Sequence, residues 1–155
     1  MAPEPFLTLP IRSCRDLVHV RHRARQIAQL LHFDPREVIG IAAGAFVVAE
    51  RAKTLLRRGH LCFAIVEGHL RLFAKAASES RSQPHDLLVL SKPIPPGETR
   101  LAAEDLHWLV RQVQLLAPTT LQEEMAQQNR EVLELLTVLR GCATPSETSV
   151  KPSAA

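Results

Sequence analysis

The sequence is short of aromatic side chains, because its 155 residues include five Phe, one Trp and no Tyr. A core of this composition must be filled mainly by Leu, Val, Ile and Ala. No apolar run reaches the roughly 18 residues that a membrane span requires. No basic region followed by an apolar one marks the N-terminus as a secretion signal. The length suits one globular domain and is too short for two large ones.

Cysteines are also few, and their arrangement argues against a disulfide framework. The three of them, Cys14, Cys62 and Cys142, are widely separated and odd in number. Small secreted proteins stabilised by disulfides have an even number of cysteines at close spacing. We therefore expect a protein of the reducing cytoplasm.

The usual signatures of catalysis and metal binding are missing. The sequence has no Gly-x-Ser-x-Gly, no phosphate-binding loop and no Cys-x-x-Cys. Two groups of metal-ligand side chains deserve comparison with a zinc site. His19 and His22 lie one helical turn apart without a predictable third ligand, and His60, Cys62 and His69 surround a hairpin. A buried cysteine and exposed loop histidines explain the second group equally well, so no metal site is expected.

Charge is unevenly distributed along the chain. Residues 1–81 carry a net charge of +6 and residues 82–155 a net charge of −3. A basic first half suits nucleic acid, an acidic protein partner or simply a solvated surface. The basic residues Arg15, Arg21, Arg23 and Arg25 lack interleaved aromatic residues for base stacking. Nucleic-acid binding is therefore not expected.

The hydrophobic pattern of the first half predicts a strand followed by two helices. Phe6–Arg12 alternates apolar and polar residues around Pro10, which places it at the edge of a sheet. Ser13 is a good N-cap for a helix over 14–31. Asp34 and Pro35 begin a second helix, which is unusually apolar and is predicted to end at about Arg58, before Gly59.

The remainder predicts three further strands and two further helices. Strands are expected over 61–66, 70–76 and 86–91, and the prolines within 92–99 are expected to exclude regular structure there. Helices are expected from Ala103 and from Leu121 to Gly141. The predicted organisation is a domain over 1–91, a Pro-rich linker over 92–100, a helical extension over 101–141 and a disordered tail over 142–155.

The last predicted helix carries a heptad-like seam. Apolar residues alternate by four and three positions, with one polar member; the six are Leu121, Met125, Gln128, Val132, Leu135 and Leu139. Such a seam packs either against a second copy of the chain or against the domain of its own chain. Fewer than three heptads are present, and the sequence leaves both arrangements open.

A strand, two helices and a meander of strands form an α+β two-layer sandwich with helices on one sheet face. The stretches RDLVHVRHRARQIAQLLHFD, EVIGIAAGAFVVAERA and HLCFAIVEGHLRLFAKA fill this layout. Through these three stretches, residues 11–76 resemble the GHKL ATPases, and most closely the bacterial anti-sigma-factor serine kinases. The part after residue 101 resembles the coiled-coil connector that follows such domains in some actinobacterial signalling proteins.

The resemblance implies where a catalytic site would lie. The family has a Glu on the second helix and, four residues later, an Asn that binds Mg²⁺. Without a gap these positions fall on Val47 and Arg51, and in a register shifted by three they fall on Glu50 and Thr54. Neither register supplies the Asn, and an Arg would repel the cation. The family also has a glycine-containing motif that binds adenine, and its place falls on residues 77–81, which contain no glycine. A third family motif is a glycine-rich lid over the phosphates, for which only Gly97 remains.

Because the chain lacks these family motifs, the resemblance implies a non-catalytic regulatory or scaffolding protein without a cofactor. The expected partner is a protein: an anti-sigma antagonist, a sigma factor or a signalling kinase. The expected contact surfaces are the basic helix face with Arg15, Arg21 and Arg25, and the 121–139 seam. The alternative is a divergent serine/threonine kinase that uses ATP and Mg²⁺, and a nucleic-acid-binding protein is the third hypothesis.

Overall fold

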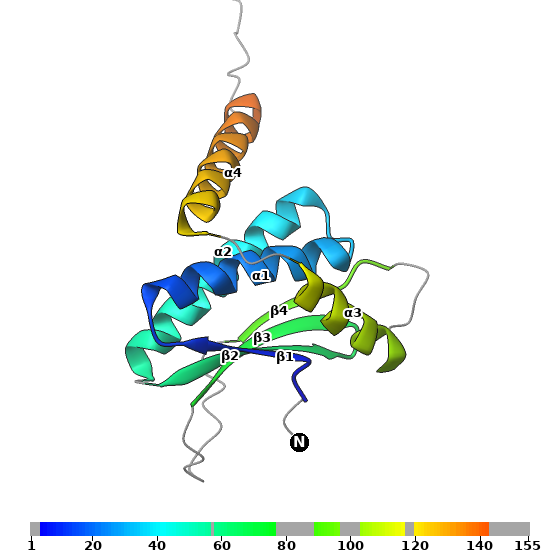
Figure 1. The fold of residues 1–155 in the computed structure, drawn as a ribbon. Helices are drawn as coiled ribbons and strands as arrows, with labels where there is room; N and C mark the ends of the chain where they lie inside the picture. Colours follow the sequence, from blue (N-terminus) through cyan, green and yellow to red (C-terminus); the bar gives the residue numbers. More distant parts are fainter. Residues whose placement is uncertain (1–3, 57, 77–88, 97–102, 117–119, 143–155) are drawn as a thin grey trace, which may run out of the picture. The chain divides into compact units, whose positions relative to one another are not determined.

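A computed structural model of the chain describes residues 4–56, 58–76, 89–96, 103–116 and 120–142. The chain divides into two compact units, Met1–Leu121 and Gln122–Ala155. The first unit contains a sheet and three helices, and the second contains the long helix α4 (Leu121–Cys142) apart from its first residue. Figure 1 shows these elements in the colours of the sequence.

The sheet is a four-stranded antiparallel meander. Its strands are β1 (Leu7–Ile11), β2 (Gly59–Val66), β3 (His69–Ala76) and β4 (Val89–Pro93), in the spatial order β1-β2-β3-β4. The two edge strands each contain a proline, Pro10 in β1 and Pro93 in β4. The edge position predicted for the first strand is confirmed.

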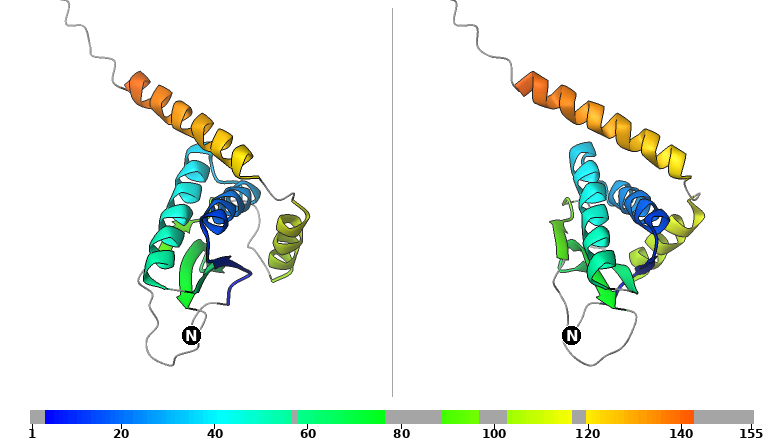
Figure 2. Two further views of the ribbon diagram at one scale, coloured as in Figure 1. Left: turned by 60° about the vertical axis from the view of Figure 1, so that its left-hand side comes forward. Right: turned by 90° about the vertical axis from the view of Figure 1, so that its left-hand side faces the viewer.

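Three helices cover one face of this sheet. They are α1 (Cys14–Leu30), α2 (Pro35–Leu55) and α3 (Ala103–Leu115). Helix α1 contacts α2 on one side and α3 on the other (Figure 2). The α+β class, with an antiparallel sheet and helices on one face, is therefore confirmed.

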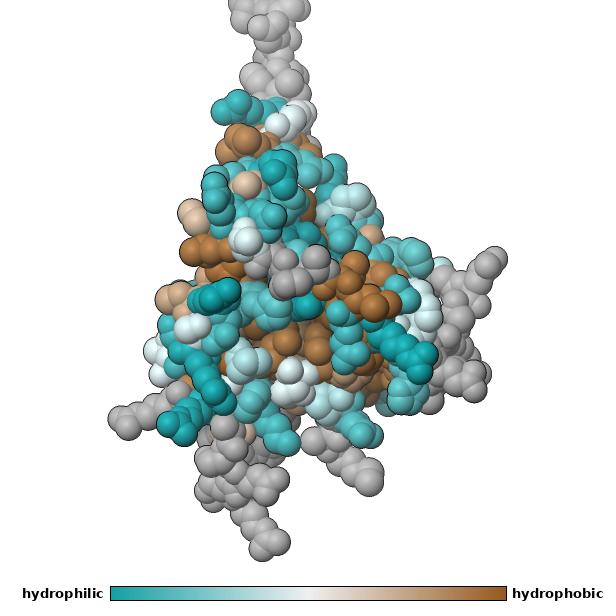
Figure 3. Space-filling model, in the orientation of Figure 1, coloured by the Kyte–Doolittle hydropathy of each residue, from teal (hydrophilic) through white to brown (hydrophobic). Residues whose placement is uncertain are grey.

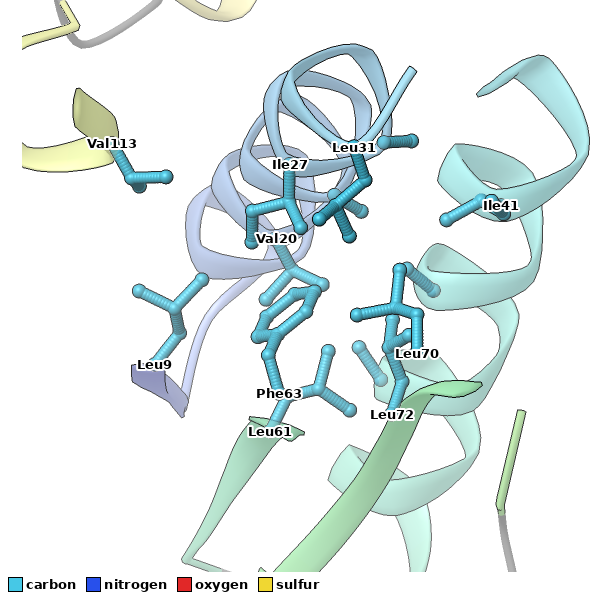
Figure 4. Packing of buried hydrophobic residues seen from close by; sticks show 14 of the residues in the cluster. Leu9, Val20, Ile27, Leu31, Ile41, Leu61, Phe63, Leu70, Leu72 and Val113 are labelled. Atoms are coloured by element: carbon cyan, nitrogen blue, oxygen red, sulfur yellow. The ribbon is translucent and has the colours of Figure 1, made fainter. Parts of the chain in front are cut away.

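The core lies between the sheet and the three helices. Its largest fully buried side chain is Phe63 of β2, which has no exposed surface. Figure 4 shows Phe63 beneath Val20 and Ile27 of α1, with Ile41 of α2 and Val113 of α3 on opposite sides of α1. Leu109 of α3 is buried with Val113, so α3 contributes to the same core as the sheet.

Two details of the prediction are wrong. Helix α2 ends at Leu55, because Leu56 is already extended (φ −112°, ψ 108°) and Gly59 begins β2. The basic residue in its last turn is Lys53. Lys92 and Pro93, expected in irregular structure, belong to β4 and pair with Leu70 and His69. An edge strand tolerates Pro93 because one side of such a strand needs no ladder hydrogen bonds.

The starts of α1 and α2 have the caps that the sequence predicts. The Ser13 hydroxyl accepts a hydrogen bond from the Asp16 amide at 3.2 Å, and the Asp16 carboxylate accepts one from the Ser13 amide at 2.9 Å. This reciprocal pair is a capping box. Asp34 accepts from the amides of Arg36 and Glu37 at 2.8 and 3.0 Å. Each cap satisfies amides that the first helical turn leaves without a partner.

The Asp16 carboxyl has a pKa below its ordinary value. Partial burial acts in the opposite direction and would raise this pKa, but hydrogen bonds from the amides of Arg12 and Ser13 to the carboxylate outweigh burial. A carboxylate that accepts backbone hydrogen bonds is stabilised in its charged form. The carboxylate half of the capping box therefore stabilises α1 at neutral pH, and this contribution is lost as the pH falls through the lowered pKa of Asp16.

A close approach joins α2 to the edge strand β4. A Cβ atom on Gly44 would lie 2.9 Å from Cδ2 of Leu90, which is closer than side chains pack. Glycine therefore lets the Leu90 side chain reach the backbone of α2. This contact helps to hold the short strand β4 under the helix layer.

Helix α1 ends in a Schellman motif that lacks the usual glycine. The His32 amide donates to the Gln29 carbonyl at 3.1 Å, and the Phe33 amide donates to the Ala28 carbonyl at 3.1 Å. His32 has φ +60°, a left-handed conformation that glycine adopts without strain. The following side chain, Phe33, is buried in the core.

We predict that His32→Gly raises the free energy of unfolding by about 0.5–1 kcal/mol, because it removes the left-handed strain. His32 is exposed, so few packing contacts are lost. Urea denaturation followed by circular dichroism measures the change. His32→Ala is the matched control, since it removes the same imidazole but keeps the strained Cβ. If both variants were equally stabilised, backbone strain would not be the cause.

Candidate protein-interaction surface

The α2 positions singled out by the sequence lie on the outer surface of that helix. The buried stripe of α2 includes Val38, Ile41, Ala45, Ala49 and Ala52. Val47, Glu50, Arg51 and Thr54 are all exposed, with 44% of Val47 accessible. Helix α2 therefore presents both proposed registers to solvent, and neither is enclosed by the described residues.

The chemistry of these four side chains gives little support for a bound cation. The Thr54 hydroxyl donates to the Glu50 carbonyl, one helical turn earlier, at 3.1 Å. Glu50 is the only carboxylate among the four positions, and Arg51 adds a positive charge. Mg²⁺ prefers octahedral coordination by several oxygen atoms. The other two expected motifs, residues 77–81 and Gly97, lie outside the described residues.

The basic face expected on α1 is only partly exposed. Arg15 is exposed, whereas Arg21 and Arg25 are buried, with 7% and 6% of their surfaces accessible. Both buried arginines take part in polar interactions. Arg15 is therefore the member of this predicted surface that a partner could reach directly.

Arg23 is one of the four basic residues considered above for nucleic-acid binding, and in the structure it makes hydrogen bonds within the chain. Its Nη1 donates to the carbonyls of Val113 and Leu116 at 2.7 and 3.2 Å, and to Oε1 of Gln26 at 2.8 Å. These carbonyls lie at the end of α3, where the helix leaves acceptors without an internal partner. A cation there also opposes the negative end of the helix dipole. Arg23 thus attaches α3 to α1.

The pKa values of Arg23 and His19, two side chains of α1, are both lowered. Burial lowers the pKa of the Arg23 guanidinium. Burial also lowers the pKa of His19, and the positive charge of Arg23 lowers it further. His19 is therefore neutral at physiological pH. Among the residues that the structure describes, no three metal-ligand side chains gather at one place, so His19 and His22 do not acquire a third ligand.

His60, Cys62 and His69 do not form the cluster that the sequence suggested. His60 lies near the start of β2, whereas His69 pairs with Val66 at the end of that strand. Six residues of extended strand separate these ends by about 20 Å. Cys62 is buried between them; its thiol accepts a hydrogen bond from the Thr8 hydroxyl at 3.8 Å. Burial raises the pKa of this thiol, which keeps it protonated and unreactive.

Helix α4 carries the clearest candidate surface. All six members of its seam are exposed, and the five apolar ones are accessible as follows: Leu121 55%, Met125 56%, Val132 47%, Leu135 39% and Leu139 63%. A buried helix face would show far smaller values. Within its own unit, no described residue covers the seam, which is therefore a candidate contact surface.

Two further apolar residues are exposed on α3. Trp108 and Leu115 are accessible to 53% and 79%, and their spacing of seven residues places them on one side of the helix. Sequence reasoning missed this surface, although the spacing of Trp108 and Leu115 is visible in the sequence. Figure 3 shows one face of the molecule, on which apolar patches lie among hydrophilic residues.

Comparisons with known proteins give no match: no family model, no curated protein and no solved structure is significantly similar to this chain. Within the described ranges, none of the helices is both long and apolar enough to cross a membrane.

Proposed function

We propose that the chain is a non-catalytic regulatory protein of bacterial signalling, built on a degenerate anti-sigma-kinase-like domain of the GHKL type. It acts by binding another protein, such as an anti-sigma antagonist, a sigma factor or a signalling kinase. The observation that carries the proposal is the exposed seam of α4, which offers five apolar side chains to a partner.

The α2 surface supports the non-catalytic part of the proposal. At the positions where the resemblance implies the catalytic Glu and the Mg²⁺-binding Asn, the chain has either Val47 and Arg51 or Glu50 and Thr54. In the first register an apolar side chain replaces the base and a cation replaces the metal ligand. In the second register the Thr54 hydroxyl already donates to the helix backbone.

Titration calorimetry with Mg·ATP tests this proposal. We expect no saturable heat, because neither register supplies the set of oxygen ligands that Mg²⁺ requires. Saturable binding with a Kd in the micromolar range would overturn the non-catalytic assignment and favour the divergent kinase. The same titration with ATP and EDTA is the control that separates binding of the Mg²⁺ complex from binding of the free nucleotide.

Two variants would then identify the register of such a site. If the shifted register were correct, Glu50→Gln would abolish phosphoryl transfer while Val47→Ala left it unchanged. Both residues are exposed on α2, so neither substitution is expected to change the stability of the fold by more than about 0.5 kcal/mol. Unchanged transfer with Glu50→Gln would instead show that the shifted register is wrong.

A further inference from the structure

The spacing of the α4 seam assigns its residues to heptad positions. A step of three residues leads from a to d, and a step of four leads from d to the next a. Met125, Val132 and Leu139 are therefore a positions. Leu121, Gln128 and Leu135 are d positions. A β-branched residue at a with leucine at d favours two-stranded coiled coils, which is the combination that Val132 and Leu135 provide.

The polar member of the seam decides between the two orientations of a helix pair. In a parallel pair in register, each seam residue faces its own copy, so Gln128 faces Gln128 of the second copy. Each side-chain amide can then donate to the carbonyl oxygen of the other. Both amides are thereby satisfied inside the apolar seam.

An antiparallel pair with the same overlap gives a worse arrangement. Leu121 then faces Leu139 of the second copy, and Met125 faces Leu135. Gln128 faces Val132 of the second copy, and this mismatch occurs twice in the pair. Val132 offers no hydrogen-bonding group, so two amides are buried without a partner, and each such loss is costly.

We propose that the α4 seam binds a second copy of the same helix, in parallel and in register, with a Gln128 pair near its centre. This inference rests on the proposed function and deepens it, because the chain would then meet its signalling partner as a dimer held together by the seam. The polar layer sets the register and the orientation, at a cost in affinity. The seam runs over fewer than three heptads, so the interface is small and the dimer exchanges with monomer, as is typical of interfaces below about 1,200 Å².

Sedimentation equilibrium of the full chain over a wide concentration range tests the dimer. We expect reversible monomer–dimer association, and Leu135→Asp should weaken it by more than about tenfold, because an unpaired carboxylate would be buried in the seam. Leu133→Asp is the matched control on the same helix. Leu133 is 63% exposed but lies outside the seam, so its substitution should change the dimer Kd by less than about twofold.

Disulfide trapping tests the orientation. Leu121→Cys is introduced with Cys14→Ser and Cys142→Ser, while Cys62 stays because it is 1% exposed. In a parallel dimer, Leu121→Cys chains cross-link with one another under mild oxidation. In an antiparallel dimer they cross-link only when mixed with Leu139→Cys chains, and that result would overturn the proposal.

Gln128→Leu gives an independent test of the polar layer. We expect this variant to associate more than about tenfold more tightly, because the amide no longer loses its hydration in the seam. The Leu121→Cys and Leu139→Cys variants should then begin to cross-link with each other, since nothing would enforce the orientation. Weaker association of Gln128→Leu would contradict the proposed layer.

These outcomes are distinguishable from the test of the proposed function. A chain that stays monomeric at all concentrations, or that loses association equally with Leu133→Asp and Leu135→Asp, overturns the inference about α4 alone. A chain that forms the parallel dimer and also binds Mg·ATP keeps this inference and overturns the non-catalytic assignment.

Discussion

Phe63→Ala is expected to lower the free energy of unfolding by about 3–5 kcal/mol, because it removes a fully buried ring and leaves a cavity. The Phe63 side chain has no exposed surface and lies in the centre of the core. Its ring centroid is 6.4 Å from that of Phe6, at an interplanar angle of 46°. Helices from both sides of α1 contact the same core, so collapse around the cavity would disturb several elements.

The matched control for this prediction is Phe73→Ala. Phe73 lies on the neighbouring strand β3, and it points to the other face of the sheet, where it is only partly buried. Urea denaturation monitored by circular dichroism should show a cost for Phe73→Ala of about 1–2 kcal/mol, well below that for Phe63→Ala. Equal costs would mean that the outer face of the sheet is packed as tightly as the core.

Arg23→Met is expected to detach α3 from α1 and to lower the free energy of unfolding by about 2–3 kcal/mol, because hydrogen bonds from a charged donor to two carbonyls are lost. Methionine keeps the apolar part of the side chain, so the loss reports on the guanidinium. Hydrogen exchange measures the local effect: the amides of α3 should exchange faster, while those of β2 and β3 should change less.

Two other variants sharpen the result for Arg23. Arg15→Met makes the same change on the exposed side of α1 and should alter stability by no more than about 0.5 kcal/mol. Arg23→Lys keeps the charge but not the planar donor group, so it should recover part of the protection of α3. If Arg23→Met left exchange in α3 unchanged, Leu109 and Val113 alone would hold that helix.

The sequence predicted the local structure well where a side chain interacts with its own neighbours. Ser13 and Asp34 cap α1 and α2 as expected, because a short polar side chain can reach the free amides of the next turn without help from distant residues. The alternation around Pro10 placed β1 at an edge for a similarly local reason. The hairpin after Val66 follows from Glu67 and Gly68, both of which have positive φ.

Predictions failed where distant residues decide the outcome. Arg21 and Arg25 border the apolar stripe of α1, and a helical wheel does not show that they are covered. Arg23 binds carbonyls about 90 residues further along the chain. Its role as a cap could not be predicted without knowing where α3 packs. The end of α2 at Leu55 was also not predicted, because helix-forming residues continue beyond Leu55. The chain must instead become extended there in order to enter β2 at Gly59.

One part of the candidate surface follows from the sequence, and another part does not. The six seam residues follow from their spacing alone, and the structure adds that they are exposed. The sequence did not predict the burial of the basic face on α1, where only Arg15 of the three predicted residues is exposed.

The prolines of the two outer strands have a consequence for how this protein can assemble. Free strand edges are the places where copies of a β-protein join into continuous ribbons and fibrils. Here each outer strand is five residues long and contains a proline, Pro10 on one side and Pro93 on the other. Both routes for growth of the sheet are thereby obstructed. Ordered contacts between copies are left to the helices, which can form and dissolve without templating an aggregate.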